Sequence, residues 1–299
     1  MIAERPVVFA CGADSLIGIV HPAPTPSRRG VLIVVGGPQY RVGSHRQFLH
    51  LARHLAASGV PAMRMDYRGM GDSDGEYLGF EYVGDDIRAA IDAFQDQVPA
   101  LEEVVLWGLC DAASAITFYA RRDARVCGIV LLNPWVRTPA GEARAYIRHY
   151  YLKRLADRAF WRKLFAGGIN PITVVRSFLD LAAAATGGNE DDSRPAAADE
   201  TGAAPSQIMP RPPPDGRPLP ERMLEALEAY RGQVLLITSG RDLTAREFED
   251  AAAASRRWRR ALRGDRVRRR VLKDADHTFS RRAWKEEVAA ATAEWLRAW

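Results

Sequence analysis

VVLWGLCDAASA, residues 104–115, joins an apolar run to a cysteine and then to a series of small residues. The apolar run predicts a buried strand, and the small residues predict a helix that packs closely against it. Cys110 falls at the sharp turn between them, with Gly108 and Ala112 leaving room on either side. This strand–turn–helix layout presents a nucleophile at the end of a sheet, here with cysteine in place of serine and alanine in place of the last glycine.

The composition indicates a sizeable protein of a reducing compartment. The 299 residues, 47% of them hydrophobic, can bury one large domain with an insertion. Cys11, Cys110 and Cys127 are an odd and sparse set, which argues against a disulfide framework. No apolar run is long enough to span a bilayer, and residues 1–6 lack the basic and apolar regions of a secretory signal. We therefore expect a cytoplasmic protein without a membrane span.

Strand and helix patterns alternate along most of the chain. Residues 5–11 and 16–21 predict an opening antiparallel hairpin. Helical patterns include 82–97, 221–230 and 244–262, and a closing helix begins near Arg281. Continuous apolar runs predict strands buried on both faces at 30–35, 61–66, 104–109, 126–132, 234–239 and 267–272. The alternation predicts an α/β fold, with a mostly parallel, doubly wound sheet and helices on both faces.

The alternation breaks after residue 137. Residues 138–185 have a helical pattern rich in aromatic side chains, whereas residues 186–220 are rich in Ala, Pro, Gly and Asp. We expect a core of residues 1–137 and 221–299, a helical lid at 138–185 and a flexible segment at 186–220. An ordinary helical excursion that closes one end of the core is the alternative. Aromatic helices beside a polar stretch favour a cover for a substrate.

A cysteine nucleophile needs a base, and the base needs an acid that orients it. In chains with this turn the acid and then the histidine follow the nucleophile, and only His149 and His277 follow Cys110. His149 lies in the expected lid, where an exposed or packing role is expected, whereas His277 directly follows the last strand. Asp242 leaves the end of strand 234–239. We therefore expect Cys110, Asp242 and His277 to form a catalytic triad.

Asp276 is the other candidate for the acid, because it immediately precedes His277. Asp242 has an alternative role as well, since it stands where the N-cap of the following helix would be. Side chains that are adjacent in sequence seldom reach the required ring nitrogen well, so geometry favours Asp242 over Asp276.

An acyl-transfer intermediate needs two N–H donors for its oxyanion. One expected donor is the backbone N–H of Asp111, and the other comes from the loop at residues 36–43. Pro38 has no N–H, so Gln39 is the expected second donor and Tyr40 the next choice. The glycines of that loop lack the Lys-Ser/Thr of a phosphate-binding loop, and no Cys/His cluster has metal-ligand spacing. We expect no metal and no cofactor.

Five segments carry a family resemblance: GGPQYRVGSHR (36–46), DYRGMGDS (66–73), WGLCD (107–111), SGRD (239–242) and DHTFS (276–280). Together they resemble the α/β-hydrolase superfamily and, more closely, the exosortase A system-associated hydrolase 1 family. The resemblance implies the α/β-hydrolase fold and a bacterial protein linked to clusters for exopolysaccharide production and protein sorting. It implies no substrate, because the family name describes genomic context.

These residues favour a thioesterase or esterase, or an acyltransferase, that acts on an ester or thioester through an acyl-enzyme. Cys110 would attack the acyl carbonyl, His277 would act as base and then acid, and Asp242 would hold the imidazole. The alternative is a non-catalytic, hydrolase-like binding or scaffold protein. The presence of an acid, a base and oxyanion segments together favours the enzyme.

Residues 256–270 are rich in arginine, and three interpretations stay open. The default is a solvated helix face followed by an edge strand. Nucleic-acid binding is the weakest, because the net charge is only +5 and no recognition motif accompanies the run. An acidic acyl carrier protein or the phosphates of coenzyme A would also fit, and would deliver a thioester. The expected partner is therefore a small acyl ester or thioester, with one of these as a candidate carrier.

Overall fold

The computed structural model describes residues 4–37, 39–136 and 216–299. The expected lid at 138–185 lies outside the described residues, as does the part of the expected flexible segment before residue 216. Within the described ranges, no helix is both long and apolar enough to cross a membrane.

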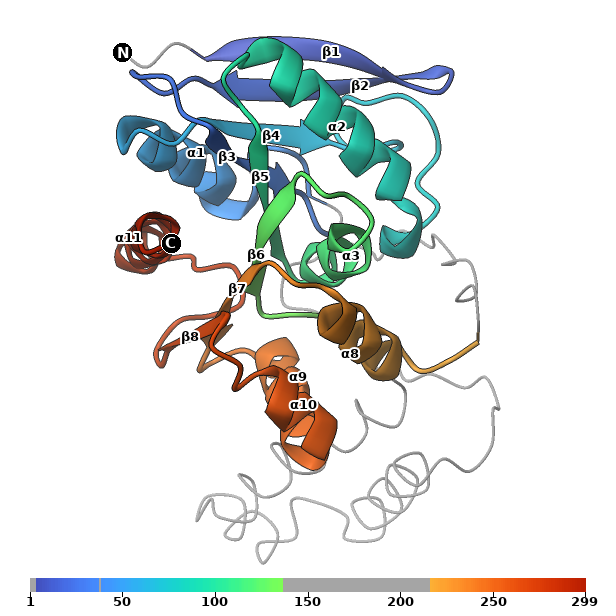
Figure 1. Cartoon of the computed structure of the whole chain (residues 1–299), viewed down its shortest axis with the longest axis vertical. Helices are drawn as coiled ribbons and strands as arrows, with labels where there is room; N and C mark the ends of the chain where they lie inside the picture. The colour runs from blue at the N-terminus through green and yellow to red at the C-terminus, as the bar shows by residue number, and fades with distance from the viewer. Residues whose placement is uncertain (1–3, 38, 137–215) are drawn as a thin grey trace, which may run out of the picture. The chain divides into compact units, whose positions relative to one another are not determined.

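The described strands are β1 (Arg5–Cys11), β2 (Asp14–His21), β3 (Arg29–Val34), β4 (Ala62–Asp66), β5 (Glu103–Leu109), β6 (Val126–Leu132), β7 (Gln233–Ser239) and β8 (Val267–Leu272). They form an eight-stranded sheet in the order β1-β2-β4-β3-β5-β6-β7-β8 (Figure 1). β1 pairs with β2, and β2 with β4, in antiparallel fashion, whereas the other neighbours are parallel. The prediction of a mostly parallel sheet that opens with a hairpin is confirmed.

The described helices are α1 (Gln47–Ala57), α2 (Gly84–Gln97), α3 (Asp111–Ala120), α8 (Leu219–Ala229), α9 (Leu243–Ala254), α10 (Arg256–Ala261) and α11 (Arg282–Arg297), with short 3₁₀ turns at Ser44–Arg46 and Phe80–Tyr82. α1 packs against α11 on one face of the sheet, and α2, α3 and α8 lie together on the other (Figure 1). The sheet is therefore wound on both faces, as the alternation of apolar runs and helical patterns predicts.

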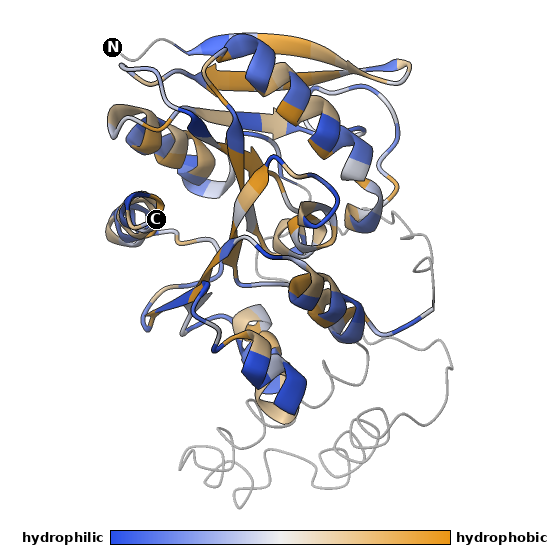
Figure 2. Cartoon of the chain, viewed as in Figure 1, coloured by the Kyte–Doolittle hydropathy of each residue, from blue (hydrophilic) through white to orange (hydrophobic). Residues whose placement is uncertain are grey.

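The central strands form because their side chains find apolar neighbours on both faces. In β5 every residue after Glu103 is buried, and the same holds for β3 after Arg29. Trp107 of β5 meets Phe48 of α1 edge-on, with ring centroids 5.6 Å apart. Figure 2 shows the apolar colour concentrated in the sheet and polar residues on the outer helices. Each large apolar side chain buried in this way stabilises the fold by about 1.5–3 kcal/mol.

The helix expected at residues 244–262 is two helices, α9 and α10. Ser255 between them is extended, with φ −109° and ψ 127°, and its hydroxyl accepts a hydrogen bond of 3.3 Å from the N–H of Trp258. Ser255 is thus the N-cap of α10. The break lets Trp258 lie edge-on against Phe248 of α9, with ring centroids 5.4 Å apart. A tertiary contact has overridden a continuous helical pattern.

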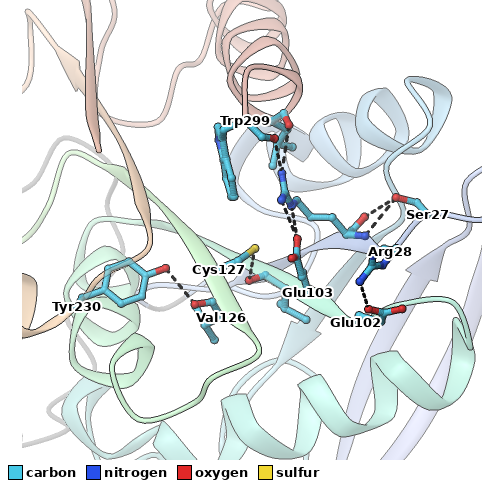
Figure 3. Close-up of polar contacts among 11 residues, drawn as sticks. Ser27, Arg28, Glu102, Glu103, Val126, Cys127, Tyr230 and Trp299 are labelled. Carbon is cyan, nitrogen blue, oxygen red and sulfur yellow. Dashed lines mark hydrogen bonds and ion pairs between the residues drawn. The ribbon is translucent and has the colours of Figure 1, made fainter. Parts of the chain in front are cut away.

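The amino ends of β3 and β5 are connected to the last residues of the chain. Arg29 donates to Glu103 Oε2 from Nε (2.9 Å) and Nη2 (2.7 Å), donates to the backbone oxygen of Trp299 (2.9 Å), and stacks over the Trp299 ring. Cys127 lies at the same edge, with its Sγ 3.6 Å from the backbone oxygen of Val104 (Figure 3). Burial raises the pKa of the Cys127 thiol to about 11. A thiol in such surroundings is unreactive at neutral pH.

Candidate active site

Cys110 lies at the turn between β5 and α3, at the carboxyl edge of the sheet. Its backbone has φ 61° and ψ −125°, a combination that residues other than glycine rarely adopt and that stores strain. Its N–H donates to Leu132 O (2.9 Å), and its carbonyl accepts from the N–H groups of Ala113 (3.1 Å) and Trp135 (3.2 Å). Strain held in place by such contacts is typical of a turn that presents a functional side chain.

Close backbone approach makes this turn possible. A Cβ atom at Gly108 would lie 2.7 Å from the carbonyl of Ala112 and 2.8 Å from Ala113 N. Any larger residue at position 108 would therefore push helix α3 away from strand β5. Gly36, in the loop after β3, is restricted in the same way, because a Cβ there would overlap the Asp111 carboxylate and the carbonyl of Leu109.

The structure brings Asp242 and His277 together. His277 Nδ1 lies 2.9 Å from Asp242 Oδ2, and the Asp242 side chain is only 6% exposed. The N–H does not point at that oxygen, so among the described residues Nδ1 has an ion-pair distance without an aligned hydrogen bond. Contacts of this kind in hydrolytic sites commonly align only when substrate binds.

Asp242 also has the structural role that its position suggests. Its carboxylate accepts hydrogen bonds from the N–H groups of Thr244 (3.2 Å) and Ala245 (3.0 Å), which makes it the N-cap of α9. The two roles are compatible, because the oxygen that accepts from Ala245 is the one that faces His277. The cap holds the carboxylate in one orientation beside the imidazole.

Asp276, the other candidate acid, faces a different partner. Its carboxylate accepts from the N–H of Ser280 (2.9 Å) and from the Ser280 hydroxyl. Burial would raise the pKa of Asp276, but these hydrogen bonds outweigh it and hold the pKa below its usual value. The carboxylate at ion-pair distance from His277 Nδ1 is therefore that of Asp242.

Asn133, which immediately follows β6, connects the loops of the site. Its side-chain amide donates to His277 O (3.2 Å) and to Ser239 Oγ (3.0 Å), and its Oδ1 accepts from Ser239 N–H (2.8 Å). The residue before it, Leu132, accepts from Cys110 N–H, so consecutive residues at the end of β6 contact both Cys110 and His277. Sequence reasoning missed Asn133. Its signal was a polar residue directly after a continuous apolar run.

The two expected oxyanion residues lie on different segments, Gln39 in the loop after β3 and Asp111 at the start of α3. Gln39 follows β3, and its side-chain oxygen accepts from Ser44 N–H (3.2 Å). Asp111 is the first residue of α3, and its carboxylate accepts from the N–H groups of Gly37 and Ala112, each at 3.0 Å. Burial raises the pKa of Asp111 to about 6, because these hydrogen bonds offset only part of the effect.

The segments 36–46 and 66–73 form one connected unit. Fully buried Asp66 accepts from Arg41 N–H (2.6 Å) and Asp72 N–H (3.2 Å) and pairs with the Arg41 guanidinium, which also pairs with Asp72 (2.6 Å). These contacts hold residues 66–73 against the loop that follows β3. An open hollow of about 700 Å³ borders them, lined by Gln39, Tyr40, Arg41, Val42, Met70, Gly71 and Asp72. Its lining includes Gln39 but neither Cys110 nor His277. The candidate site is therefore defined by its reactive side chains and not by this hollow.

Three of the nine arginines in residues 256–270 form ion pairs at the surface with other described residues. This stretch spans α10, the following turn and β8, which is the edge strand. Arg266 donates to the backbone oxygens of Leu227 and Gly232. Ion pairs between exposed side chains, such as the three that follow, each contribute about 0–1 kcal/mol to the free energy of unfolding. The ion pairs are Arg257–Glu228 (2.6 Å), Arg269–Glu249 (2.6 Å) and Arg270–Glu287 (3.2 Å).

The mostly parallel sheet, covered by helices on both faces, defines the α/β class of proteins, and the strained Cys110 turn lies at the carboxyl edge of that sheet. The chain belongs to the alpha/beta hydrolase family, whose model matches residues 31–291. A comparison with curated proteins finds no match.

Solved structures with the same fold include three named hydrolases. An esterase from Pyrococcus furiosus is 16% identical, with 100% of this chain and 93% of that chain covered and a TM-score of 0.63. A dienelactone hydrolase from Anabaena variabilis is 14% identical, with 99% and 98% covered and a TM-score of 0.59. A thermophilic esterase from Thermogutta terrifontis is 18% identical, with 98% of each chain covered and a TM-score of 0.55. At these identities the likeness shows the fold alone.

Proposed function

We propose that this protein is an acyl hydrolase or acyltransferase that uses Cys110, His277 and Asp242 as a catalytic triad on an ester or thioester. The observation that carries the proposal is the strained turn at Cys110, together with its contact to the end of β6. There Leu132 accepts from Cys110 N–H, and the next residue, Asn133, donates to His277 O. Asp242 lies 2.9 Å from His277 Nδ1, as an orienting acid should. The cysteine, the acid and the histidine follow the carboxyl ends of three different strands, β5, β7 and β8, which supports a shared site.

In the proposed reaction, His277 holds the proton of the Cys110 thiol, and the thiolate sulfur attacks the acyl carbonyl carbon. The carbonyl π electrons move to oxygen, and the backbone N–H groups of Asp111 and Gln39 stabilise that oxyanion. The carbon–oxygen or carbon–sulfur bond to the leaving group then breaks, and His277 gives its proton to the departing alcohol or thiol. Cys110 is left as a thioester acyl-enzyme.

The second half of the reaction repeats these steps with a new nucleophile. His277 removes a proton from water, whose oxygen attacks the acyl carbon and releases a carboxylic acid and the Cys110 thiol. An alcohol, amine or thiol in place of water yields a transferred acyl group. A thioester passes its acyl group on more readily than an oxygen ester does, so the choice of cysteine suits both hydrolysis and transfer.

A non-catalytic binding or scaffold protein is the competing function. It would have no need for a turn that keeps a non-glycine residue at φ 61°, nor for a buried carboxylate against His277. The strained turn costs stability, and a scaffold could lose it without consequence. The presence of the turn and the carboxylate together favours the enzyme.

For the particular family, we propose the exosortase A system-associated hydrolase 1 family on the segments quoted above. Their contacts support this: Asp66 connects 36–46 to 66–73, and Asp242 connects 239–242 to 276–280. An acyl carrier protein or coenzyme A is the proposed carrier, with Arg256 and Arg260 of α10 as the contact. Replacing both by Glu should raise KM for an acyl-coenzyme A and leave turnover of a neutral p-nitrophenyl ester unchanged.

The test is intact-protein mass spectrometry after incubation with a p-nitrophenyl ester and with an N-acetylcysteamine thioester. The wild-type protein should carry one acyl group, located on Cys110 by peptide mapping. Cys110→Ala should carry none and should not turn over, whereas Cys110→Ser should keep some esterase activity. Cys127→Ala is the matched control. Burial raises the pKa of the Cys127 thiol, so this thiol should not react, and its removal should leave acylation unchanged. Full turnover by Cys110→Ala would exclude the covalent mechanism.

A further inference from the structure

The side chain of Asp111 joins the nucleophile turn to the loop after β3. One carboxylate oxygen accepts from the N–H of Gly37 in that loop, and the other accepts from Ala112 N–H in α3. Gly36 packs so closely that a Cβ would overlap Asp111 Oδ1 and Leu109 O. Two segments 74 residues apart in the chain are thus held together by one carboxylate and one backbone contact.

This contact determines which loop N–H can serve the reaction. The N–H of Gly37 is bonded to Asp111, so it is not available to an acyl oxygen. Pro38 has no N–H. The next donor along the loop is the backbone N–H of Gln39. Its position depends on the loop that the Asp111 carboxylate holds through the N–H of Gly37.

The same carboxylate is costly where it lies. Its neighbours include the rings of Tyr67 and Tyr77, which stack 5.4 Å apart, as well as Cys110 and His277. Of these groups only His277 can bring a positive charge. Burial raises the pKa of Asp111 to about 6 despite the backbone hydrogen bonds to its carboxylate. Residues that raise the energy of the fold and lie at a reacting centre are candidates for function.

We propose that the Asp111 side chain is a positioning residue that holds the Gly36–Gly37 backbone so that the N–H groups of Gln39 and Asp111 face the same acyl oxygen. This inference rests on the proposed function, because it assigns a role in acyl-enzyme formation. Asp111 does not touch the acyl group through its side chain. It acts through the loop, and its effect should appear only in steps that develop an oxyanion.

The experiment compares two reactions of the same thiol. Acylation of Cys110 by p-nitrophenyl acetate develops an oxyanion, whereas alkylation by iodoacetamide is a direct displacement at carbon and develops none. In Asp111→Ala, acylation should be about 100-fold slower, as for loss of one oxyanion donor, with kcat reduced and KM changed less than about threefold. Alkylation should proceed at the wild-type rate or faster, because a nearby negative charge is gone.

Two further variants separate this role from helix stability. Asp111→Asn keeps the shape and one acceptor oxygen, and should restore about one tenth of the wild-type acylation rate. Asp85→Ala removes an exposed acid from the first turn of α2 and is the matched control for the helix dipole, with both rates unchanged.

Parallel loss of acylation and alkylation in Asp111→Ala would overturn the inference, because it would show a damaged fold or a damaged thiolate. Equal acylation of wild type and Asp111→Ala would overturn it as well. If wild-type Cys110 takes up no acyl group but is alkylated, the proposed function fails, and the inference fails with it.

Discussion

The side-chain amide of Asn133 donates a hydrogen bond of 3.2 Å to the backbone oxygen of His277. The same amide exchanges two hydrogen bonds with Ser239, at the end of the strand that leads to Asp242. Asn133 is fully buried, and its φ of 41° is one that Asn adopts more readily than most residues. A satisfied buried amide is rigid, so the orientation of His277 depends on β6 as well as on β8.

Replacing Asn133 by Ala should therefore lower kcat/KM about 10- to 100-fold, because the imidazole loses an anchor and misplacement of a reacting group slows the step. The free energy of unfolding should fall by about 1–3 kcal/mol, since Ser239 N–H is left buried without its acceptor. Ester turnover and urea unfolding measure the two effects. Ser239→Ala is the control. It removes the contacts of the Ser239 hydroxyl but keeps the hydrogen bond from the Asn133 amide to His277 O. A comparable activity loss in that variant would show that Asn133 acts through general stability.

Asp242 has two roles that one substitution can separate. Asn is also a good N-cap, so Asp242→Asn should keep the start of α9 and change the free energy of unfolding by less than about 0.5 kcal/mol. It removes the negative charge beside His277, and kcat/KM should fall by about three to four orders of magnitude. Asp276→Asn, which disturbs only the contact with Ser280, should cost far less activity. Equal losses in the two variants would make Asp276 an equal candidate for the acid.

The strain at Cys110 predicts a trade between stability and activity. Glycine adopts φ 61° and ψ −125° freely, so Cys110→Gly should be more stable than Cys110→Ala by about 1 kcal/mol, the relief of strain minus the added chain entropy of glycine. Neither variant has a nucleophile, so both should be inactive. Urea unfolding of the two proteins gives the difference. A glycine variant that is less stable than the alanine variant would mean that the turn is unstrained.

His21 should make stability depend on pH. It is fully buried, and its Nε2 accepts from Arg64 Nε (3.0 Å). Burial, together with the Arg64 charge, lowers the pKa of His21 to about 4 from 6.5. Between those values the unfolded chain binds a proton that the native state does not. Stability is therefore full above about pH 6.5 and falls by up to about 3 kcal/mol as pH drops to about 4.

The measurement is the free energy of unfolding as a function of pH, for wild type and for His21→Gln. The Gln amide oxygen can still accept a hydrogen bond from Arg64. Asp111 has a raised pKa, about 6, so its effect has the opposite sign: stability falls as pH rises from about 3.8 to 6. The wild-type curve alone mixes the two effects. The difference between wild type and His21→Gln isolates His21, and a difference that is flat from pH 7 to 4 would exclude its role.

The sequence by itself determined the fold and the candidates for the triad. Continuous apolar runs such as β5 and β6 are buried on both faces, which is typical of a parallel sheet covered by helices. In such a sheet the carboxyl ends of the strands meet at one edge. Residues that follow the strands, such as Cys110, Asp242 and His277, are therefore expected near one another from the sequence alone.

Only the tertiary structure decided how those side chains pair. Asp242 and Asp276 are both acids near His277, and their directions separate them: one faces the imidazole and the other faces Ser280. Asn133 and the Asp111 carboxylate gained roles in the same way, through contacts with residues far away in the chain. Local spacing predicts where a strand ends because burial is periodic. It does not predict a hydrogen bond across the sheet edge, which depends on the packing of several strands at once.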